Sequence, residues 1–404
     1  MAFRLVWAGR TVSQLGDEIT LLALPWLVAS TTSSPLAVGA LEAFAFLPTI
    51  AFGLPFGAIA DRRSRRKAMV EADLLRAGVM ATIPLMLVFG WHAHLLQVLA
   101  VALTAGAARA LFDSSSQAFL ADIVPRGSIV EANARFGMTD GFAVVVGPPL
   151  AGVLIATVGA AAALAFDAFT FCASAAALLW VSGVVEQRSH KEQSLRGSIR
   201  EGLSYIRRQR HILTLTCTVG AANVGSGMAV GLLVIFLQQD LALSGWHAGI
   251  VFATNGLGAV VASQLARRLS MRTGLCRTFV LGLFVAASGL TLLASARSHN
   301  WGATAAVGMG IFGLGVMTHI VASASLRQLL VPRELLGRVT SSYRTVANSG
   351  VAAGALIGGV VGEWFGVRTG LITGAAFYGV VALTALFTPL SGLDPPDVGI
   401  SAST

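Results

Sequence analysis

The chain has 404 residues, of which 55% are hydrophobic and only 12% charged. An average soluble protein carries about 25% charged residues. Such a scarcity of charge excludes a soluble enzyme, a disordered chain and a disulfide scaffold. The apolar runs are continuous over about 20 residues, whereas the strands of an outer-membrane barrel alternate apolar and polar residues. The net charge of +9 suits either nucleic-acid binding or basic cytoplasmic loops, and the positions of the charges decide between them.

The apolar runs predict twelve membrane-spanning helices. We expect the first six near 6–30, 36–59, 69–90, 95–118, 129–156 and 160–184. We expect the other six near 212–238, 246–268, 276–296, 302–326, 339–363 and 367–390. The one long polar gap follows the sixth run. The pattern therefore predicts an all-α integral membrane protein, with an N-terminal six-helix bundle (1–185), a cytoplasmic linker (186–211), a C-terminal six-helix bundle (212–390) and a cytoplasmic tail (391–404).

The basic residues indicate the orientation in the membrane. Most of the 28 lysines and arginines fall in segments that twelve spans place on one side, among them the loop 62–67 and the linker 186–211. The opposite side holds only Arg297 and Arg368. The positive-inside rule then places both termini in the cytoplasm, with the chain in the cell membrane. The basic residues mark topology, so we expect a lipid bilayer and no nucleic acid as partner.

The linker contains a short amphipathic pattern. Within 198–210, Ile199, Leu203 and Ile206 share one helical face and arginines occupy the other. This pattern favours a helix at the cytoplasmic membrane surface, and a partner-binding helix is the alternative.

The two halves of the chain repeat at an offset of 207 residues. Val-Pro-Arg precedes the fifth predicted helix at 124–126 and the eleventh at 331–333. At the same offset Gly147, Gly152 and Gly159 correspond to Gly354, Gly359 and Gly366. The matching order of helices indicates a parallel repeat of two six-helix units.

The second predicted helix ends in a charged motif. Residues 57–66 read Gly-Ala-Ile-Ala-Asp-Arg-Arg-Ser-Arg-Arg, which resembles the G-x-L-x-D-R-x-G-R-[RK] loop of the major facilitator superfamily, with Ser64 in place of the usual glycine. The resemblance implies a twelve-helix fold in which this loop latches the two halves in the outward-facing state. The alternative is that its arginines only fix topology. The candidate latch residues are Gly57, Asp61, Arg62, Arg65 and Arg66, with Asp113 and Asp122 as possible partners on the fourth helix.

The fifth predicted helix carries a second motif of the family. Its residues are Gly141, Gly147, Pro148, Pro149 and Gly152, and they resemble the G-x-x-x-G-P-x-x-G-G motif of the antiporter and exporter branch. Two features depart from that pattern: the first spacing is longer, and Val153 replaces the last glycine. Prolines bend a helix and glycines let a neighbour approach closely. The motif therefore favours export, and generic small-residue packing is the alternative.

Ionisable residues inside the apolar runs are the candidates for proton coupling, because charges in a membrane core are costly and usually functional. The first helix carries Arg10, Gln14, Asp17 and Glu18 on one stripe. Burial favours the protonated form of a carboxylic acid, whereas a nearby arginine favours the charged form. A static buried ion pair is the alternative for each residue. The proposed coupling residues are Asp17, Glu18 and Asp140 as titrating acids and Arg109 as their partner.

The remaining polar residues of the spans are candidates for a substrate cavity. They are Arg10, Gln14, Glu42, Asp167, Asn223, Asn255, His319 and Asn348, with Gln264 and Arg344 beside them. Nearly all the charged ones lie in the first half. This asymmetry suggests that the N-terminal half couples protons and the C-terminal half shapes the cavity. For His319, a packing role is the alternative.

The motifs together predict a transporter and no enzyme. The chain contains no nucleotide-binding loop of the type G-x-x-x-x-G-K-[ST], no cluster with metal-ligand spacing and no nucleophile paired with a base, so we expect no cofactor. Residues 10–17, and Leu-Pro-Trp at 24–26, resemble the drug:proton antiporter branch with macrolide-type and siderophore exporters. The resemblance implies a monomer that exchanges protons for lipophilic small molecules. The alternatives are a narrow siderophore or lipid exporter, a nutrient importer, and a non-transporting membrane protein.

Overall fold

The computed structural model describes residues 2–62, 64–91, 93–181, 195–298 and 302–388. The side chains of residues 52–62, at the end of α2, are outside this description, as are most of the predicted linker before 195 and the tail after 388. Every regular element in the described part is a helix.

The long helices of the first half follow the predicted runs. They are α1 (Ala2–Thr32), α2 (Pro35–Arg62), α3 (Arg65–Val88), α4 (Leu95–Ile123), α5 (Ile129–Val158) and α6 (Ala160–Leu179). α5 has 30 residues. At 1.5 Å per residue it is about 45 Å long, more than the thickness of a bilayer core. Prolines lie inside α1, α3 and α5 without ending them, as neighbouring helices allow in membrane proteins.

The second half begins with a short helix and then repeats the long ones. Its elements are α7 (Leu195–Arg208), α8 (Arg210–Val230), α9 (Leu233–Ile235), the π-helix η2 (Phe236–Asp240), α10 (Gly245–Thr273), α11 (Leu275–Ala294), α12 (Ala303–Leu330), α13 (Arg333–Phe365) and α14 (Val367–Leu386). The predicted run 212–238 is therefore interrupted. Gly231, after the end of α8, lies against Ala355 of α13, and a short α-turn and a π-turn replace the continuous helix.

Nine helices among the described residues are long and apolar enough to cross a membrane. α1 and α3 are not among them and carry charges inside their length, such as Asp17 and Arg76. The described apolar part of α2, Pro35–Ala51, is shorter. Large hydrophobic side chains are exposed on many of the helices, as expected for contact with lipid. The chain is a multi-pass membrane protein.

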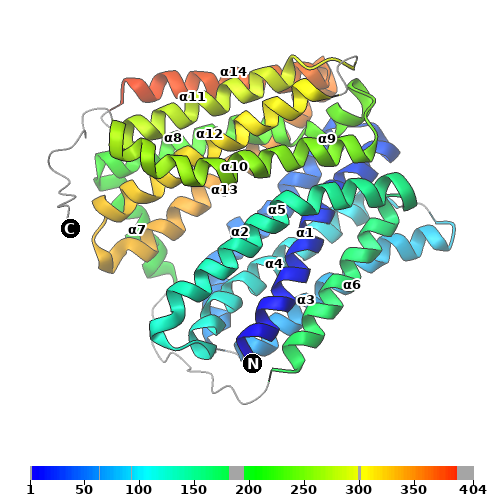
Figure 1. The fold of residues 1–404 in the computed structure, drawn as a ribbon, viewed down its shortest axis with the longest axis horizontal. Helices are drawn as coiled ribbons and strands as arrows, with labels where there is room; N and C mark the ends of the chain where they lie inside the picture. The colour runs from blue at the N-terminus through cyan, green and yellow to red at the C-terminus, as the bar shows by residue number, and fades with distance from the viewer. Residues whose placement is uncertain (1, 63, 92, 182–194, 299–301, 389–404) are drawn as a thin grey trace.

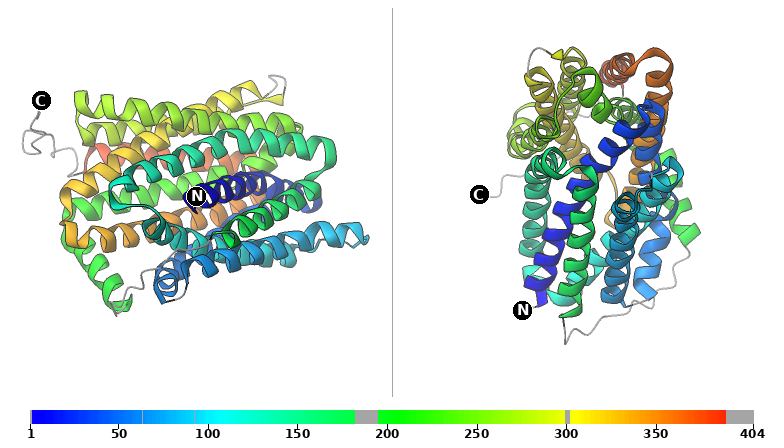
Figure 2. Two further views of the ribbon diagram at one scale, coloured as in Figure 1. Left: turned by 60° about the horizontal axis from the view of Figure 1, so that its bottom comes forward. Right: turned by 90° about the vertical axis from the view of Figure 1, so that its right-hand side faces the viewer.

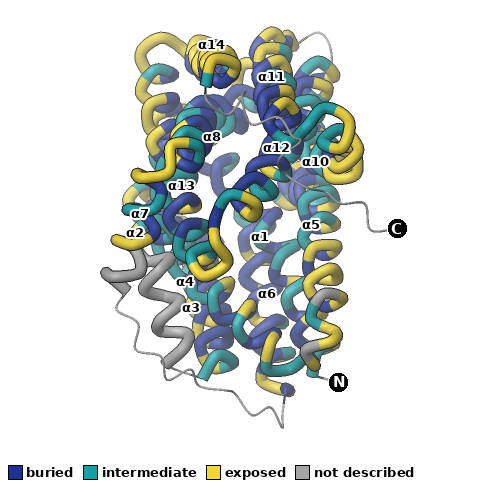
Figure 3. Tube along the Cα trace, turned by 90° about the vertical axis from the view of Figure 1, so that its left-hand side faces the viewer, coloured by how far each residue is buried: buried dark blue, intermediate teal, exposed yellow. Residues whose placement is uncertain are grey.

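The helices pack in two sets, which occupy different parts of the molecule (Figures 1 and 2). In the first set α1 packs on α5 and α6, and α4 packs on α2 and α3. In the second set α12 packs on α10 and α11, while α8 packs on α13 and α14. Buried residues concentrate where neighbouring helices face one another (Figure 3).

The two sets meet through α2 with α13 and α5 with α10. Gly39 of α2 lies against the backbone of Ala355, and Gly152 of α5 lies against the backbone of Gly245. Ser34 donates a hydrogen bond to Glu363 at 2.7 Å. All these contacts lie near the end of the molecule where α1 ends and α2 begins. The closed end of the structure is therefore the end opposite the N-terminus.

Glycines make the repeated features of the two halves possible. Gly159 follows α5 with φ 88°, and Gly366 follows α13 with φ 91°, a region that other residues rarely adopt. The two positions correspond at the predicted offset. The glycine stripe of α13 packs closely on α8, where Gly350, Gly354 and Gly358 lie against the backbone. The stripe therefore lets the backbones of α13 and α8 approach directly.

The amphipathic helix α7 uses its apolar face on the protein. Ile206 is 2% exposed and packs with Ile212, Val331 and Val339. Tyr205 donates a hydrogen bond to the carbonyl of Leu330 at 3.2 Å. Ile206 of the apolar face therefore packs over the junction of α12 and α13, while the side chain of Ile199 lies outside the described residues.

Candidate functional site

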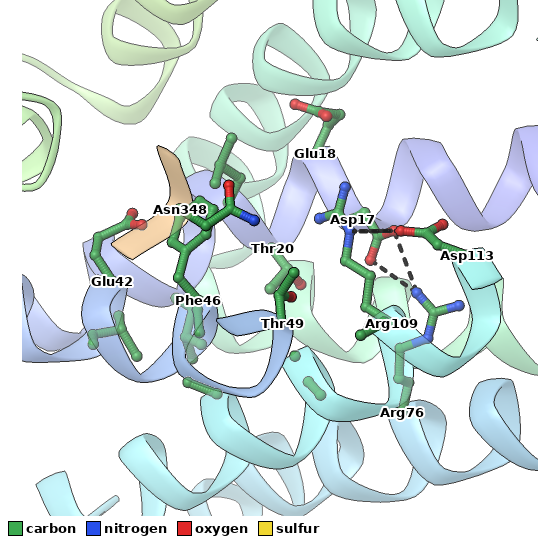
Figure 4. Close-up of a pocket in the computed structure, with 18 of the residues that line it drawn as sticks. Asp17, Glu18, Thr20, Glu42, Phe46, Thr49, Arg76, Arg109, Asp113 and Asn348 are labelled. Atoms are coloured by element: carbon green, nitrogen blue, oxygen red, sulfur yellow. Dashed lines mark hydrogen bonds and ion pairs between the residues drawn. The ribbon is translucent and has the colours of Figure 1, made fainter. Parts of the chain in front are cut away.

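A cavity of about 700 Å³ lies between the two sets of helices (Figure 4). Its wall comes mainly from α1, α2, α3 and α4, with Phe171 from α6. The second set contributes Ser341, Arg344, Thr345 and Asn348, all from α13. A cavity of this size holds a drug-sized molecule.

Asp17 is the centre of the charged part of the cavity. Its Oδ1 lies 3.2 Å from Nη1 of Arg76, and its Oδ2 lies 4.0 Å from Nε of Arg109. The Asp17 side chain is 12% exposed. Three helices, α1, α3 and α4, therefore bring one carboxylate and two guanidinium groups together. The predicted pairing of Asp17 with Arg109 is a long contact, and the closer partner is Arg76.

Arg76 is the most deeply buried of these cations, at 1% exposure. Its Nη2 donates to Asp73 at 2.5 Å, and Asp73 is fully buried. Its guanidinium lies 4.2 Å from the ring centroid of Phe171 and 4.9 Å from that of Phe112. Aromatic faces stabilise a cation, and here they replace part of its lost hydration.

The ion pairs continue along α1 toward its first residue. Asp113 lies 3.9 Å from both Arg109 and Arg10. Arg10 also contacts Asp140 of α5 at 3.3 Å and Ser116 of α4 at 3.3 Å. Carboxylates and guanidinium groups thus alternate from Asp73 to Asp140, across four helices. We call this series, Asp73–Arg76–Asp17–Arg109–Asp113–Arg10–Asp140, the charge relay.

Glu18 lines the cavity beside the charge relay and contacts the glycine-proline motif. Its side chain lies directly against Gly147 of α5, where a Cβ would overlap it. Pro148 and Gly152 lie against α10. The motif therefore packs on α1 through Gly147 and on α10 of the second set through Pro148, Pro149 and Gly152. Gly141, the first glycine of the motif, has open space on its side-chain face, where a Cβ would meet none of the described residues within 4 Å.

Glu42 and Asn348 lie at the other end of the cavity (Figure 4). Glu42 lies on α2 and Asn348 on α13, and Phe46 and Thr49 of α2 line the cavity beside them. Both predicted cavity residues therefore face the same space, one from each set of helices.

Three other residues predicted for the cavity belong to the first set and lie outside its wall. Arg10 lies in the charge relay between Asp113 and Asp140. Asp167 is fully buried between α6 and α1, where it accepts hydrogen bonds from Thr20 at 2.5 Å and Thr170 at 3.0 Å. Gln14 is partly buried on α1, one turn before the cavity begins. The hydroxyl groups satisfy Asp167, which acts here as a link between helices.

The predicted polar residues of the second set other than Asn348 also lie outside the cavity wall. His319 is 1% exposed and its Nε2 lies 2.9 Å from the hydroxyl of Tyr378. Asn223 donates to the carbonyl of Ala347 at 2.9 Å, and Asn255 packs on Gly313. In this conformation the side chains of His319 and Asn223 and the backbone of Asn255 join helices of the second set to one another.

The candidate latch residues are only partly visible. Arg65 contacts Asp122 at 2.7 Å, and Arg66 donates to the carbonyl of Val181. Both partners belong to the first set of helices. The side chains of Gly57, Asp61 and Arg62 lie outside the described residues.

Sequence reasoning misses part of the site. Arg76 and Asp73 are not among the predicted residues, although two opposite charges three residues apart in an apolar run signal a buried pair. Outside the cavity, Arg327 falls just beyond the predicted span 302–326, but it lies in α12 at 9% exposure, bonded to Ser323 at 2.7 Å and stacked on Tyr343. The prediction places the end of this helix where the apolar run ends, at 326, whereas α12 continues to Leu330.

Known proteins resemble the chain over almost its whole length. A family model described as "Transmembrane secretion effector" matches residues 1–402. The "Uncharacterized MFS-type transporter YfiS" of Bacillus subtilis is 26% identical over 94% of this chain and 91% of its own length. The "Multidrug efflux pump Tap" of Mycobacterium tuberculosis is 27% identical over 70% and 71%, and "Macrolide efflux protein A" of Streptococcus pyogenes is 20% identical over 91% of each.

Solved structures share the fold. The nucleoside transporter NupG has a TM-score of 0.79 at 12% identity, over 96% of this chain and 98% of that one. A bacterial homologue of the iron transporter ferroportin, in an inward-facing state, has a TM-score of 0.75 at 15% identity, over 96% and 98%.

Proposed function

Because the chain belongs to the major facilitator superfamily, in its transmembrane secretion effector family, we propose that it exports lipophilic or amphipathic small molecules in exchange for protons. The family consists of transporters, not enzymes. Relatives named as efflux pumps support export. The observation that carries the proposal is the charge relay, whose middle members line the wall of a cavity large enough for a substrate; they are Arg76, Asp17, Arg109 and Asp113.

We propose twelve spans in two bundles of six, with both termini in the cytoplasm. The charge distribution along the sequence supports this orientation. With it, the end where α2 meets α13 and α5 meets α10 is the outer end. The cavity then opens toward the cytoplasm, and the conformation is inward-facing. A monomer is sufficient, since one chain supplies every wall of the cavity.

The transport cycle follows from two ligands that favour opposite states. Substrate binds from the cytoplasm to the state described above, and the bundles then rock about the central cavity to open it outward. Protons bind in the outward state and favour the return. Exchange results because each ligand shifts the equilibrium by its difference in affinity between the states.

Asp17 is the proposed proton-binding residue, with Glu18 and Asp140 as the other candidates. Its two arginine partners stand on α3 and α4, so any movement of α1 against those helices changes how strongly they hold the charged form. A change of one contact is enough to load or release a proton. Arg109, with the longer contact, is the partner most easily separated.

The Asp17→Asn variant tests this assignment. We expect this variant to be produced and folded like the parent protein but to lose transport driven by a pH gradient. The reason is that an amide does not bind and release a proton near neutral pH. The measurement is uphill substrate movement in proteoliposomes. The matched control is Asp240→Asn, which removes a carboxylate whose ion-pair partner, Arg368, is 3.9 Å away. Uphill transport by Asp17→Asn at the parent rate would refute the assignment.

A further inference from the structure

α13 gives the cavity a polar stripe that the proposed proton coupling does not use. Ser341, Arg344, Thr345 and Asn348 recur three or four residues apart and line the cavity from one face of the helix. Thr345 donates its hydroxyl to the carbonyl of Ser341 at 3.1 Å. The side chains of Arg344 and Asn348 form no hydrogen bond and no ion pair with any residue that the structure describes. Their N–H groups are therefore available to a molecule in the cavity.

Arg344 differs from the other cations of the described cavity wall because it has no carboxylate partner. Arg76 and Arg109 both lie against Asp17, and Arg109 also lies against Asp113. The second set contributes no acid to the described part of the wall. A guanidinium group stays charged throughout the pH range of a cell, so, unlike a carboxyl group, it does not become neutral when it lacks a partner. When the bundles rock and the cavity loses water, this charge favours an anion beside it.

A second arginine lies close to this stripe. Arg327 of α12 is 9% exposed, and its guanidinium lies 3.6 Å from the centroid of the Tyr343 ring. It donates a hydrogen bond to the hydroxyl of Ser323, and no described carboxylate pairs with it. Arg344 is near enough to Arg327 for the two charges to repel each other. Two neighbouring cations without an acid between them make this part of the second set attractive to an anion.

We propose that Arg344 and Asn348 form a subsite for the acidic group of an amphipathic organic monoanion. This inference rests on the proposed function, which makes the cavity the substrate site. The guanidinium group donates paired hydrogen bonds to the acidic group. The amide of Asn348, one turn further along α13 and about 6 Å along its axis, binds a second oxygen of the ligand. Leu24, Leu41 and Phe46, from the first set of helices, give the apolar body of the ligand a surface to pack on.

Binding to the purified full-length protein in detergent tests the subsite. The probes are radiolabelled 2-naphthalenesulfonate, which is permanently negative, and radiolabelled 2-naphthalenesulfonamide, which has nearly the same shape and is neutral. We expect Arg344→Gln to weaken sulfonate binding at least about tenfold and to change sulfonamide binding less than twofold, because only the sulfonate loses a charge-assisted hydrogen bond. Arg344→Lys should recover part of the sulfonate binding, because it restores the charge without the paired donors.

Two further variants complete the binding test. Asn348→Asp places a negative charge beside the acidic group and should weaken sulfonate binding while it leaves sulfonamide binding within twofold of the parent. The control Arg135→Gln removes an exposed arginine that pairs with Glu131 on the surface of α5, and it should change the binding of neither probe.

The acidic group can belong to a small organic acid or to the headgroup of an anionic lipid, and competition separates these sources. We expect unlabelled 2-naphthoate to displace the labelled sulfonate. The same concentration of dioleoylphosphatidylglycerol should leave most of it bound, because a cavity of about 700 Å³ suits a drug-sized molecule and not a lipid with two acyl chains. Displacement by the lipid alone would assign Arg344 to a lipid headgroup and overturn the proposal.

Three other results would overturn the subsite: unchanged sulfonate binding by Arg344→Gln, an equal loss for both probes, or no sulfonate binding by the parent protein. Melting temperatures identify any variant that misfolds, and if Arg344→Gln does so, Asn348→Asp decides. Failure of proton-coupled export is a separate result. Arg344-dependent sulfonate binding without transport under a pH gradient supports the subsite and contradicts the coupling, whereas pH-driven transport of the sulfonamide without sulfonate binding does the reverse.

Discussion

At the scale of single residues, Arg76 is the cation on which the cavity wall depends most. It contacts Asp17 at 3.2 Å and Asp73 at 2.5 Å, and lies over two phenylalanine rings. Asp73 has no exposed surface. Loss of the arginine would leave that carboxylate buried and unpaired, which costs more than the pair itself contributes.

Arg76→Met should therefore destabilise the protein strongly. Breaking a buried pair by removing one partner costs about 3–5 kcal/mol. The double variant Asp73→Asn, Arg76→Met removes the orphaned charge as well and should recover at least half of the loss. Thermal unfolding of the purified variants measures both. Equal melting temperatures for the single and double variants would show that the unpaired charge of Asp73 does not cause the loss of stability.

Sequence alone identifies only some of these residues, for a physical reason. Asp17 and Arg109 stand out because a charge in an apolar run is costly wherever it points. Which charges meet depends on how α1, α3 and α4 pack, and no periodicity within one helix specifies that packing. His319 shows the converse, because a polar residue in a predicted span can serve its neighbours: it bonds Tyr378 within the second set.

At the scale of elements, α5 makes direct backbone contacts with α10 of the second set of helices. Gly152 lies against the backbone of Gly245, and Gly249 of α10 lies against the carbonyl of Pro148. Small residues are needed there because backbones approach directly. Gly141 belongs to the same motif but has open space around it. The two glycines offer a matched pair for substitution.

Gly152→Val should push α5 and α10 apart at the closed end and shift the protein away from the observed conformation. In a cysteine-free background with Thr49→Cys as reporter in the cavity, a membrane-impermeant maleimide added from outside should label the Gly152→Val variant several times faster than the parent. Gly141→Val should label as the parent does. Equal labelling of the Gly152 and Gly141 variants would contradict the assigned role of this contact.

The loop after α2 gives a second prediction at this scale, which rests on its sequence motif. Asp61→Asn should slow the transport cycle, because we propose that the loop latches the outward-facing state through this carboxylate, whose charge an amide lacks. Turnover under saturating substrate measures it. Unchanged turnover, with normal substrate binding, would leave the motif with a role in topology only.

The long helices are predictable because the length of each apolar run determines them. Their irregular parts are not predictable from the sequence in this way. The break after Val230 depends on the approach of α13 to Gly231, a contact between distant segments. The apolar face of α7 is predictable from its periodicity, but its partner is not. Ile206 packs with Val331 and Val339, a contact between distant segments that the period of one helix does not specify.

At the scale of the whole molecule, the proposed transport cycle requires that the two sets of helices separate at the end where they now meet. Ser34 and Glu363 lie on opposite sides of that contact, joined by a hydrogen bond. Cysteines at both positions, joined by a short reducible thiol cross-linker, should abolish transport, and a reducing agent should restore it. Each single cysteine should remain active. Full activity of the cross-linked protein would rule out opening at this end.

The central claim is that a proton gradient drives export, and transport in proteoliposomes measures it most directly. A panel of lipophilic cationic dyes, chloramphenicol and a macrolide is offered under an imposed pH gradient, with and without nigericin, which collapses the gradient. We predict uphill movement that stops with nigericin. Uphill movement that nigericin leaves unchanged would contradict proton coupling. No movement of any panel member, by protein shown to be folded, would contradict broad export and favour a narrow siderophore or lipid exporter, or an importer.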